Sequence, residues 1–442
     1  MRKLMTLAAL TGATLLGACG EREVILPGER LGVREVLQGS PVDAGTPANR
    51  ALSAALPGPV VNGAWPQSPV SPHVRTDHAA LSLPLALAWA TDIGQGDVKR
   101  QRLNVNPVTD GARVYTMSSD FVLSAVSART GQVIWSRTLT PSRDQSYQAQ
   151  GGGLALGGGA LFVASGFGGL YAIDPETGGE NWRQNLDAGA TGAPSYRDGM
   201  VYVTSGDSIG WALRATDGRV RWTTENAENI GGVAGAPAPA LGSERVVFGF
   251  GDATLRTAFR EGGYALWSEN LAGGRRGRVL SKIDDLTGDP VIAGDTVYAG
   301  NHSGRFAAFS LATGERRWEA QDGALERPAV VGNSVYFVSD INQLVRLDRE
   351  TGARVWAQEL PGWRPSARPS RRRDSSVANH GPVVAGGLLW VASSDGALRG
   401  FAPEDGRLAA QVAVPGGATT QPIVAGGTLY LVSADGTLIA YR

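Results

Sequence analysis

The sequence is poor in cysteine and histidine, and it carries no net charge. One cysteine, Cys19, occurs among 442 residues, so no intramolecular disulfide can form. The four histidines lack the spacing of metal ligands and have no thiol partner: His73, His78, His302 and His380. Lys and Arg total 41, as do Asp and Glu, so the charge balance gives no reason to expect a nucleic-acid partner. We therefore expect no catalytic constellation, no metal site and no bound cofactor.

Long apolar runs are also missing after the first residues. A positive start is followed by a short apolar stretch, Leu4 to Leu16, which has the layout of a secretory signal and is too short to span a bilayer comfortably. Small residues directly before Cys19 resemble a bacterial lipobox, in which the cysteine becomes the lipidated first residue. The alternative is an ordinary cleaved signal with an incidental cysteine. We expect a lipoprotein signal peptide at 1–18. By resemblance to known lipoproteins, Gly20 after the cysteine implies a lipid anchor in the outer membrane, facing the periplasm.

Residues 19–80 are rich in proline and glycine. Their prolines are Pro27, Pro41, Pro47, Pro57, Pro59, Pro66, Pro69 and Pro72. Proline cannot donate to a ladder and disfavours helix, so we expect a lipidated Cys19 followed by an extended tether with little structure of its own.

What the chain has in abundance is glycine, 61 residues, within a repeated phrase. Pro290-Val-Ile-Ala-Gly-Asp-Thr-Val-Tyr runs on to Thr313-Gly314 and Trp318, and a second copy begins at Pro328 and runs on to Trp356. Averaged over all the units the period is roughly 46 residues, and such a repeat of short β-type segments and Gly turns is typical of a β-propeller. The sequence therefore predicts an all-β fold over 81–442.

Each repeat unit is expected to form four antiparallel strands, A to D. Strand A follows a proline in most units, and strand D contains a tryptophan that packs on the neighbouring blade. These tryptophans are at positions 135, 182, 222, 267, 318 and 356, and Gln411 takes the seventh place. The last unit, Pro422 to Ala440, lacks strand D, whereas Leu85–Ile93 is a Trp strand without a unit before it. Joined, they complete one blade and close an eight-bladed ring.

Two inserted segments mark one face of this ring. The segments 268–289 and 357–381 both connect strand D to strand A, so both emerge on the same face, and insertions gathered on one face usually mark a binding side. The first changes from basic to acidic between Gly273 and Asp285, with apolar residues between. The second is strongly basic from Arg364 to Arg373. A pair of solvated loops is the alternative to a docking edge.

These features together resemble one family. The lipobox, the proline-rich tether and eight Trp-anchored blades with A-x-D-x-x-T-G turns are similar to the B lipoprotein of the outer-membrane β-barrel assembly (Bam) machinery, a quinoprotein-like (PQQ-like) propeller. Trp65-Pro66-Gln67 with His73 also resembles the segment before the first blade in such propellers. The resemblance implies a non-enzymatic scaffold that helps to fold and insert outer-membrane β-barrel proteins. Its implied partner is the set of periplasmic (POTRA) domains of the central subunit, BamA, with nascent outer-membrane proteins as a second candidate.

The resemblance also implies contact residues ahead of strand A in two adjoining blades. One stretch is matched by Lys282, Ile283, Asp284, Asp285, Thr287 and Asp289. Asp285 falls on the family's first contact Asp, but Thr287 stands at the second, so that carboxylate is missing or displaced to Asp284 or Asp289. The other stretch is matched by Asn229, Ile230, Gly231 and Gly232, where the Leu-x-Leu-Arg character of the family is absent.

Two other functions remain open. A PQQ-dependent dehydrogenase uses the same fold, and many such enzymes carry a vicinal cysteine pair over the quinone, which this chain cannot supply. A generic propeller for binding or sensing in the cell envelope is the other alternative.

Overall fold

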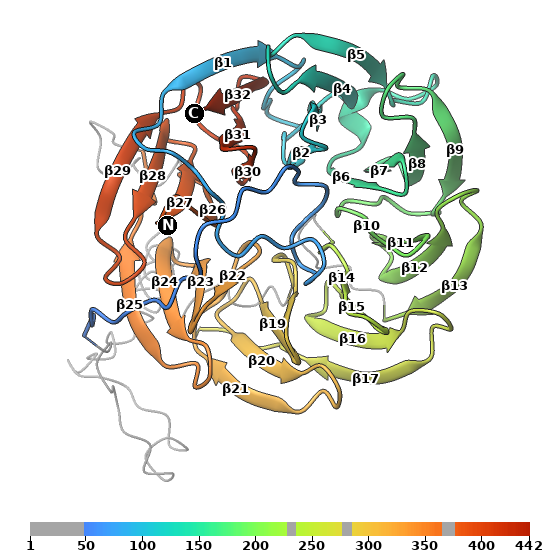
Figure 1. Cartoon of the computed structure of the whole chain (residues 1–442). Helices are drawn as coiled ribbons and strands as arrows, with labels where there is room; N and C mark the ends of the chain where they lie inside the picture. Colours follow the sequence, from blue (N-terminus) through green and yellow to red (C-terminus); the bar gives the residue numbers. More distant parts are fainter. Residues whose placement is uncertain (1–47, 228–235, 276–284, 365–375) are drawn as a thin grey trace, which may run out of the picture. The chain divides into compact units, whose positions relative to one another are not determined.

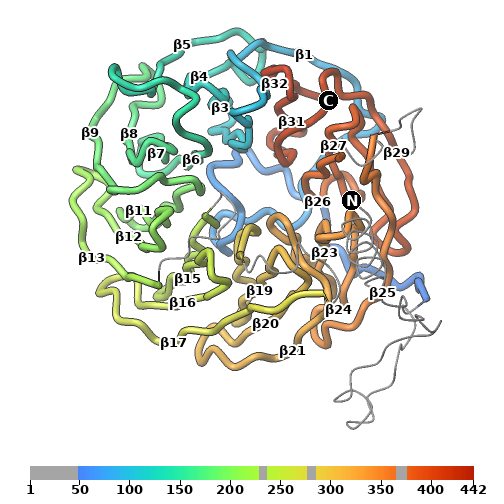
Figure 2. Tube along the Cα trace, turned by 180° about the vertical axis from the view of Figure 1, so that it is seen from behind, coloured from blue at the N-terminus to red at the C-terminus, as the bar shows by residue number. Residues whose placement is uncertain are grey.

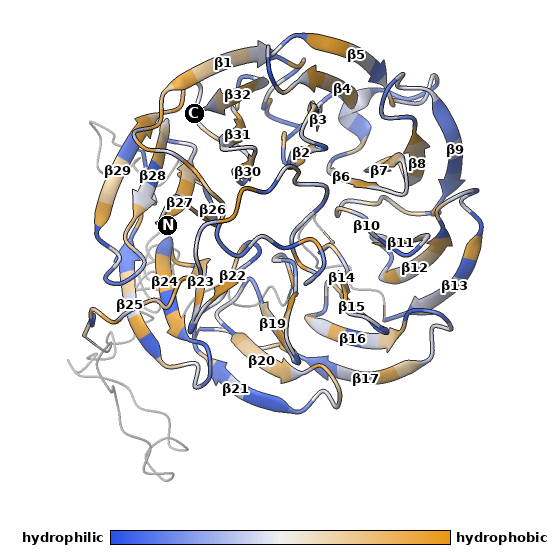
Figure 3. Ribbon diagram, in the orientation of Figure 1, coloured by the Kyte–Doolittle hydropathy of each residue, from blue (hydrophilic) through white to orange (hydrophobic). Residues whose placement is uncertain are grey.

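The fold is an eight-bladed ring, seen in a computed structural model that describes residues 48–227, 236–275, 285–364 and 376–442. Residues Ala48–Arg442 form one compact unit, with eight four-stranded antiparallel sheets around a centre (Figure 1). This confirms the predicted eight-bladed β-propeller. The middle strands carry most of the hydrophobic residues, whereas outer strands such as β9 and β21 are largely hydrophilic (Figure 3).

The strands follow chain order within each blade. Blades 1 to 4 contain β2 (Val108–Thr109), β3 (Arg113–Met117), β4 (Val122–Ser127) and β5 (Val133–Thr138); β6 (Gly152–Gly157), β7 (Ala160–Ser165), β8 (Gly169–Ile173) and β9 (Glu180–Asn185); β10 (Ser195–Arg197), β11 (Met200–Thr204), β12 (Ile209–Arg214) and β13 (Val220–Glu225); and β14 (Ala240–Leu241), β15 (Arg245–Gly249), β16 (Thr254–Phe259) and β17 (Ala265–Asn270). Blades 5 to 7 contain β18 (Val291–Ala293), β19 (Thr296–Gly300), β20 (Phe306–Ser310) and β21 (Arg316–Ala320); β22 (Ala329–Val331), β23 (Ser334–Val338), β24 (Gln343–Asp348) and β25 (Arg354–Glu359); and β26 (Asn379–Ala385), β27 (Leu388–Ser393), β28 (Ala397–Phe401) and β29 (Leu408–Ala413). A short 3₁₀ helix, η1 (Ser146–Gln148), lies between β5 and β6.

Blade 8 is built from both ends of the unit. It contains β30 (Ile423–Ala425), β31 (Thr428–Val432) and β32 (Thr437–Tyr441), and β1 (Leu87–Asp92) pairs antiparallel with β32 as its outer strand. Trp89 faces Ala440 in this register, and Ala86 and Arg442 exchange two backbone hydrogen bonds of 2.7 and 2.9 Å. The predicted closure of the ring is therefore confirmed, and neither terminal strand leaves an open gap between blades.

The outer tryptophans join neighbouring blades, as the repeat predicts. Each indole N–H donates to a carbonyl in the C–D turn of the next blade, as in Trp135 to Pro175, Trp318 to Arg349 and Trp356 to Pro403, at 3.0 to 3.1 Å. The glycine of that turn packs directly against the indole ring, so a Cβ on Gly352 would lie only 2.5 Å from an atom of Trp318. Its φ of +71° also disfavours other residues. The Thr-Gly turn is thus required both by the backbone and by the packed indole.

Residues 48–80, here called the clasp segment, contact every blade. The tether expected for 19–80 is wrong for this part, because residues 48–80 belong to the same compact unit as the blades, and residues 19–47 lie outside the described ranges. The segment crosses the middle of the ring in both views (Figure 1, Figure 2). Its hydrogen bonds reach blades 1 to 8 in turn through Trp65–Thr109, Pro66–Leu156, Gln67–Tyr196, Ser71–Leu241, Val70–Ile292, Ser53–Arg346, Ala79–Val384 and Asn62–Gly426.

The clasp segment also defines the two faces of the ring. Most of its partners lie on strand A, toward the A–B turn, so it covers the face that carries the A–B and C–D turns. The D–A connections lie on the opposite face, because strands alternate in direction. Both predicted insertions are D–A connections, between β17 and β18 and between β25 and β26, so both lie on this opposite face.

Candidate docking face and central cavity

A cavity of about 330 Å³ lies at the centre of the ring. Its walls are the chain segments that enter strand A from the D–A side, and the clasp residues Trp65, Gln67 and Ser68 line it as well. These three residues come from the segment that covers the opposite face. The cavity therefore belongs to the D–A face of the ring.

One sequence position lines the cavity in blade after blade. It is the residue directly before the proline that begins strand A, and its occupants are Asn106, Ala193, Ala236, Asp289, Arg327 and Gln421. In blade 7 the neighbouring His380 takes this role. The backbone position is repeated but the side chain is not, so the fold places different side chains around one centre, and all of them except Ala193 and Ala236 are polar. The sequence could have identified these residues, because each of the six directly precedes a strand A proline.

Glu326 is the most fully bonded acid of the cavity. Its Oε1 lies 2.5 Å from His380 Nδ1, while its Oε2 accepts hydrogen bonds from the backbone N–H of Gly381 at 2.9 Å and from Gln421 at 2.7 Å. Burial lowers the pKa of His380, but the adjacent Glu326 carboxylate raises it by more. Burial raises the pKa of Glu326, but His380 and the two donors lower it by more. The pair therefore favours a carboxylate beside an imidazolium.

Asp289 and Arg327 face each other through a hydroxyl group. Ser68 donates to Asp289 Oδ2 at 2.6 Å and accepts a long bond from Arg327 Nη1 at 3.4 Å, while Asp289 Oδ1 accepts from the backbone of Ala238 at 2.8 Å. Burial raises the pKa of Asp289 and lowers the pKa of Arg327. A guanidinium stays charged even so.

The base of the first insertion is held by an ion-pair network. Arg275 lies 2.8 Å from both Asp322 and Asp340, whose side chains are 4% and 6% exposed, and Arg354 also pairs with Asp322. Although burial lowers it, the carboxylates of Asp340 and Asp322 raise the pKa of Arg275. The described end of the insertion is therefore fixed to blades 5 and 6.

The described members of the predicted contact stretch are integrated into the fold. Asp285 is 2% exposed, and its carbonyl accepts a hydrogen bond from His302 at 2.9 Å. Thr287 donates to the carbonyl of Leu325 at 3.1 Å, and Thr287 and Asp289 both line the cavity. The structure thus brings these two together but does not present Asp285 to solvent.

The other predicted site residues lie outside the described ranges. They are Cys19, Asn229, Ile230, Gly231, Gly232, Lys282, Ile283 and Asp284. Within the described ranges, no group of three or more His, Cys, Asp or Glu residues is arranged to hold a metal ion. The same ranges contain no helix that is both long and apolar enough to cross a bilayer.

Solved structures similar to this chain include two kinds of propeller. BamB from Moraxella catarrhalis superposes with a TM-score of 0.65 at 18% identity, covering 81% of this chain and 100% of that chain. A quinohemoprotein alcohol dehydrogenase from Comamonas testosteroni gives a TM-score of 0.64 at 16% identity, covering 86% of this chain and 80% of its own. At these identities the likeness concerns the fold alone.

Sequence comparison separates the two. The outer membrane protein assembly factor BamB of Escherichia coli K12 is 26% identical over 331 residues, 74% of this chain and 81% of its own length. That of Yersinia pestis is 24% identical over 330 residues, 74% of this chain and 80% of its own length. The family model described as outer membrane protein assembly factor BamB matches residues 119–358 and 362–442, more than half of the chain. The chain therefore belongs to the family of the outer membrane protein assembly factor BamB.

Proposed function

We propose that this chain is a non-catalytic lipoprotein scaffold of the Bam complex, which docks on periplasmic POTRA domains of BamA and helps to insert outer-membrane β-barrel proteins. The observation that carries the proposal is the family model, which matches almost the whole succession of blades. The similar proteins from E. coli and Y. pestis are named for outer-membrane protein assembly.

The D–A face is the better candidate for docking. The clasp segment already covers much of the opposite face through hydrogen bonds to all eight blades. The D–A face carries the two inserted connections, and Arg275 holds the described base of one of them against Asp322 and Asp340. A fixed base reduces the conformational entropy that is lost when a partner binds beside it.

We further propose that the docking residues lie in the parts of the D–A connections before strand A of blades 4 and 5. Candidates are Asn229, Ile230, Gly231 and Gly232 in one connection and Lys282, Ile283 and Asp284 in the other. Asp285, Thr287 and Asp289 then support the contact from within the wall of the ring, since their described bonds are to the fold itself.

Membrane attachment through Cys19 completes the proposal. Asn49 and Arg50 hydrogen-bond the outer strand β25 through Ala357 and Val355, so the chain reaches the ring at the rim of blade 6. The 28 residues between Cys19 and Ala48 allow a span of at most about 100 Å when the chain is fully extended. A lipid anchored at Cys19 would leave the ring free to meet a partner beyond the headgroups.

Recovery of partners from the native envelope tests this function. The tagged full chain is extracted in mild detergent and its companions are identified by mass spectrometry. We expect BamA and its companion lipoproteins to be recovered with the chain. Recovery of the chain alone, or only with soluble redox proteins, would contradict the scaffold proposal.

A charge reversal tests the docking face separately. Asp284→Arg should reduce BamA recovery at least several-fold, because it places a cation in the proposed contact. Asp405→Arg is the matched control, since Asp405 is exposed in the C–D turn of blade 7 on the opposite face. Equal recovery with both variants would reject this connection as the docking site while leaving the scaffold function intact.

A further inference from the structure

The central cavity contains a buried cation whose bonding capacity is largely unused. Arg327 is 7% exposed and lines the cavity. A guanidinium carries five N–H donors. Among the described residues, its one acceptor within hydrogen-bond distance is Ser68 Oγ, at 3.4 Å. Buried polar groups normally find partners, so the open donors indicate a ligand or ordered water in the cavity.

Two other atoms of the cavity wall have no partner within the described part of the chain. They are Nδ1 of His302 and Oε1 of Gln421, both buried. The amide nitrogen of Gln421 donates to Glu326, so its oxygen is left to accept a hydrogen bond from elsewhere. Burial lowers the pKa of His302, so this imidazole is neutral near pH 7 and one of its nitrogens can accept. Neither of these two atoms has appreciable accessible surface, so a ligand in the cavity would meet the donors of Arg327 and not these atoms.

The acids of the cavity do not use up the cation. Glu326 is compensated by His380 and accepts from two further donors. Asp289 accepts from Ser68 and Ala238, and within the described ranges Arg327 forms no ion pair, although the charges of Asp289 and Glu326 act to raise its pKa against burial. A planar guanidinium matches a carboxylate in a bidentate arrangement, which neutral donors cannot replace.

We propose that the cavity binds a small carboxylate, with the carboxylate group on the guanidinium of Arg327. The volume of about 330 Å³ suits a molecule of the size of an acylated dipeptide. The clasp residues Trp65, Gln67 and Ser68 line the cavity on the side of the covered face, so the ligand enters from the D–A face. This site does not depend on the proposed docking of BamA.

Two probes that differ in one charge test the proposal. N-acetylglycylglycine and its C-terminal amide are titrated into the full chain in detergent and followed by ligand-observed NMR. We expect the acid to bind saturably and the amide to bind at least about tenfold more weakly, because the amide cannot form the charge-assisted pair. Absence of saturable binding of the acid, or equal binding of both probes, would overturn the proposal in favour of a water-filled cavity.

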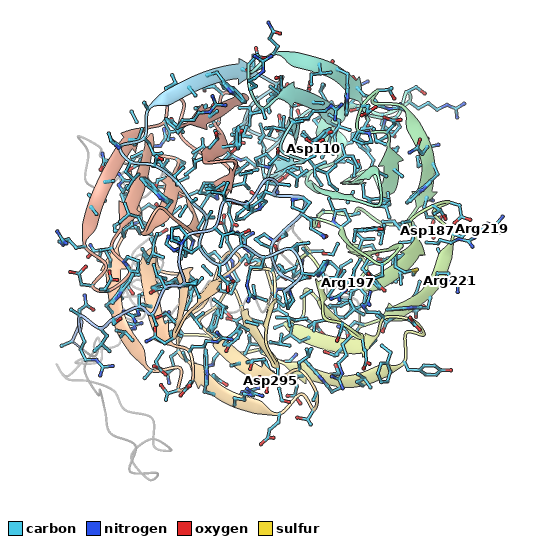
Figure 4. All side chains as sticks on the ribbon, in the orientation of Figure 1. Asp110, Asp187, Arg197, Arg219, Arg221 and Asp295 are labelled. Atoms are coloured by element: carbon cyan, nitrogen blue, oxygen red, sulfur yellow. The ribbon has the colours of Figure 1, made fainter. Side chains whose placement is uncertain are left out.

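Three variants locate the site. Arg327→Gln should weaken binding of the acid about ten- to a hundredfold by removing the cation. Asn104→Asp adds a negative charge at an exposed position of the cavity wall without changing its volume, so it should weaken binding even if Arg327→Gln fails to fold. Arg221→Gln is the charge-matched control, because Arg221 lies on the outer rim (Figure 4). Equal affinity in Asn104→Asp and Arg221→Gln would overturn the assignment to this cavity.

Discussion

Arg346 holds the beginning of the clasp segment to two blades, and its replacement is the sharpest test of that segment's role. The side chain is 1% exposed in the middle of β24. It donates to the carbonyls of Leu52 at 2.6 Å and Ser53 at 2.8 Å in the clasp segment. It also donates to the carbonyls of Pro403 at 3.2 Å and Glu404 at 3.1 Å in the next blade. One cation therefore satisfies four buried or partly buried carbonyls.

Arg346→Gln should release the clasp segment locally. Bonds to a charged group each contribute about 1.5–3 kcal/mol, and the shorter neutral side chain cannot reach all four carbonyls. Removing a buried hydrogen-bonded charge typically destabilises by about 3–5 kcal/mol. Since about 1.4 kcal/mol is a factor of ten, opening of residues 49–56 should become about a hundred to a few thousand times more frequent.

Hydrogen exchange read by mass spectrometry measures this opening directly. The amides of peptide 49–56 should exchange much faster in Arg346→Gln, whereas those of β10 to β13 should keep their wild-type rates. Arg399→Gln is the control, because Arg399 pairs with one partly exposed carboxylate, Asp395, and such pairs contribute at most about 1 kcal/mol. An acceleration in Arg346→Gln below about tenfold, or no greater than in the control, would refute the idea that Arg346 holds the clasp segment.

Three further predictions concern the cavity, the insertion and the turns. His380→Gln should lower the melting temperature most between about pH 4.5 and 6.5, where both members of the His380–Glu326 pair are charged. The stabilisation by the pair is lost at higher pH as His380 is deprotonated through its raised pKa, and at lower pH as Glu326 is protonated through its lowered pKa. A difference in melting temperature that does not depend on pH would contradict the ion pair. Arg275→Ala leaves Asp340 and part of Asp322 uncompensated, so we expect about 2–4 kcal/mol of destabilisation and faster exchange at 271–275, and an unchanged melt would show that the network is not needed. Gly352→Ala combines a left-handed φ with a Cβ only 2.5 Å from Trp318, so it should destabilise the fold by about 2–5 kcal/mol. Gly427 also has a left-handed φ but has open space around its Cβ position, so Gly427→Ala should destabilise by only about 1–2 kcal/mol. Equal melting temperatures of the two variants would refute the packing argument.

The features of the fold that repeat could be predicted from the sequence. The repeat is visible because each copy is a local solution to the same packing problem, as Trp318 against Gly352 illustrates, and seven of the eight copies carry the tryptophan. The pairing of β1 with β32 was also predictable, since a Trp strand without a unit and a unit without a Trp strand can only complete each other. Local pattern therefore determined the ring and its closure.

The clasp segment could not be predicted in the same way. Its prolines indicated a chain without helix, and residues 48–80 have turns, bends and isolated bridges instead. Such a chain forms a tether in solvent and a clasp when hydrogen-bond partners lie beside it. The decisive partners are far away in sequence, such as Ile292 for Val70 and Val384 for Ala79, and each blade supplies only one or a few of them. The sequence of residues 48–80 has no periodicity that predicts these contacts, because their spacing along the segment depends on where each blade lies around the centre of the ring.

Comparison among the blades separates scaffold from site within this one chain. The Trp and Gly positions keep the same residue in nearly every blade, since the same contact must form at each junction. The position before the strand A proline lines the cavity in six blades at an equivalent place, yet it is occupied by Asn106, Ala193, Ala236, Asp289, Arg327 and Gln421. A packing role alone gives no reason for a cation, an acid and two amides at an equivalent backbone position. The charged members gather in blades 5 and 6, beside the insertion whose base Arg275 holds. The repeat is least regular at blades 5 and 6, and we therefore expect both the partner and the small ligand to bind beside these blades.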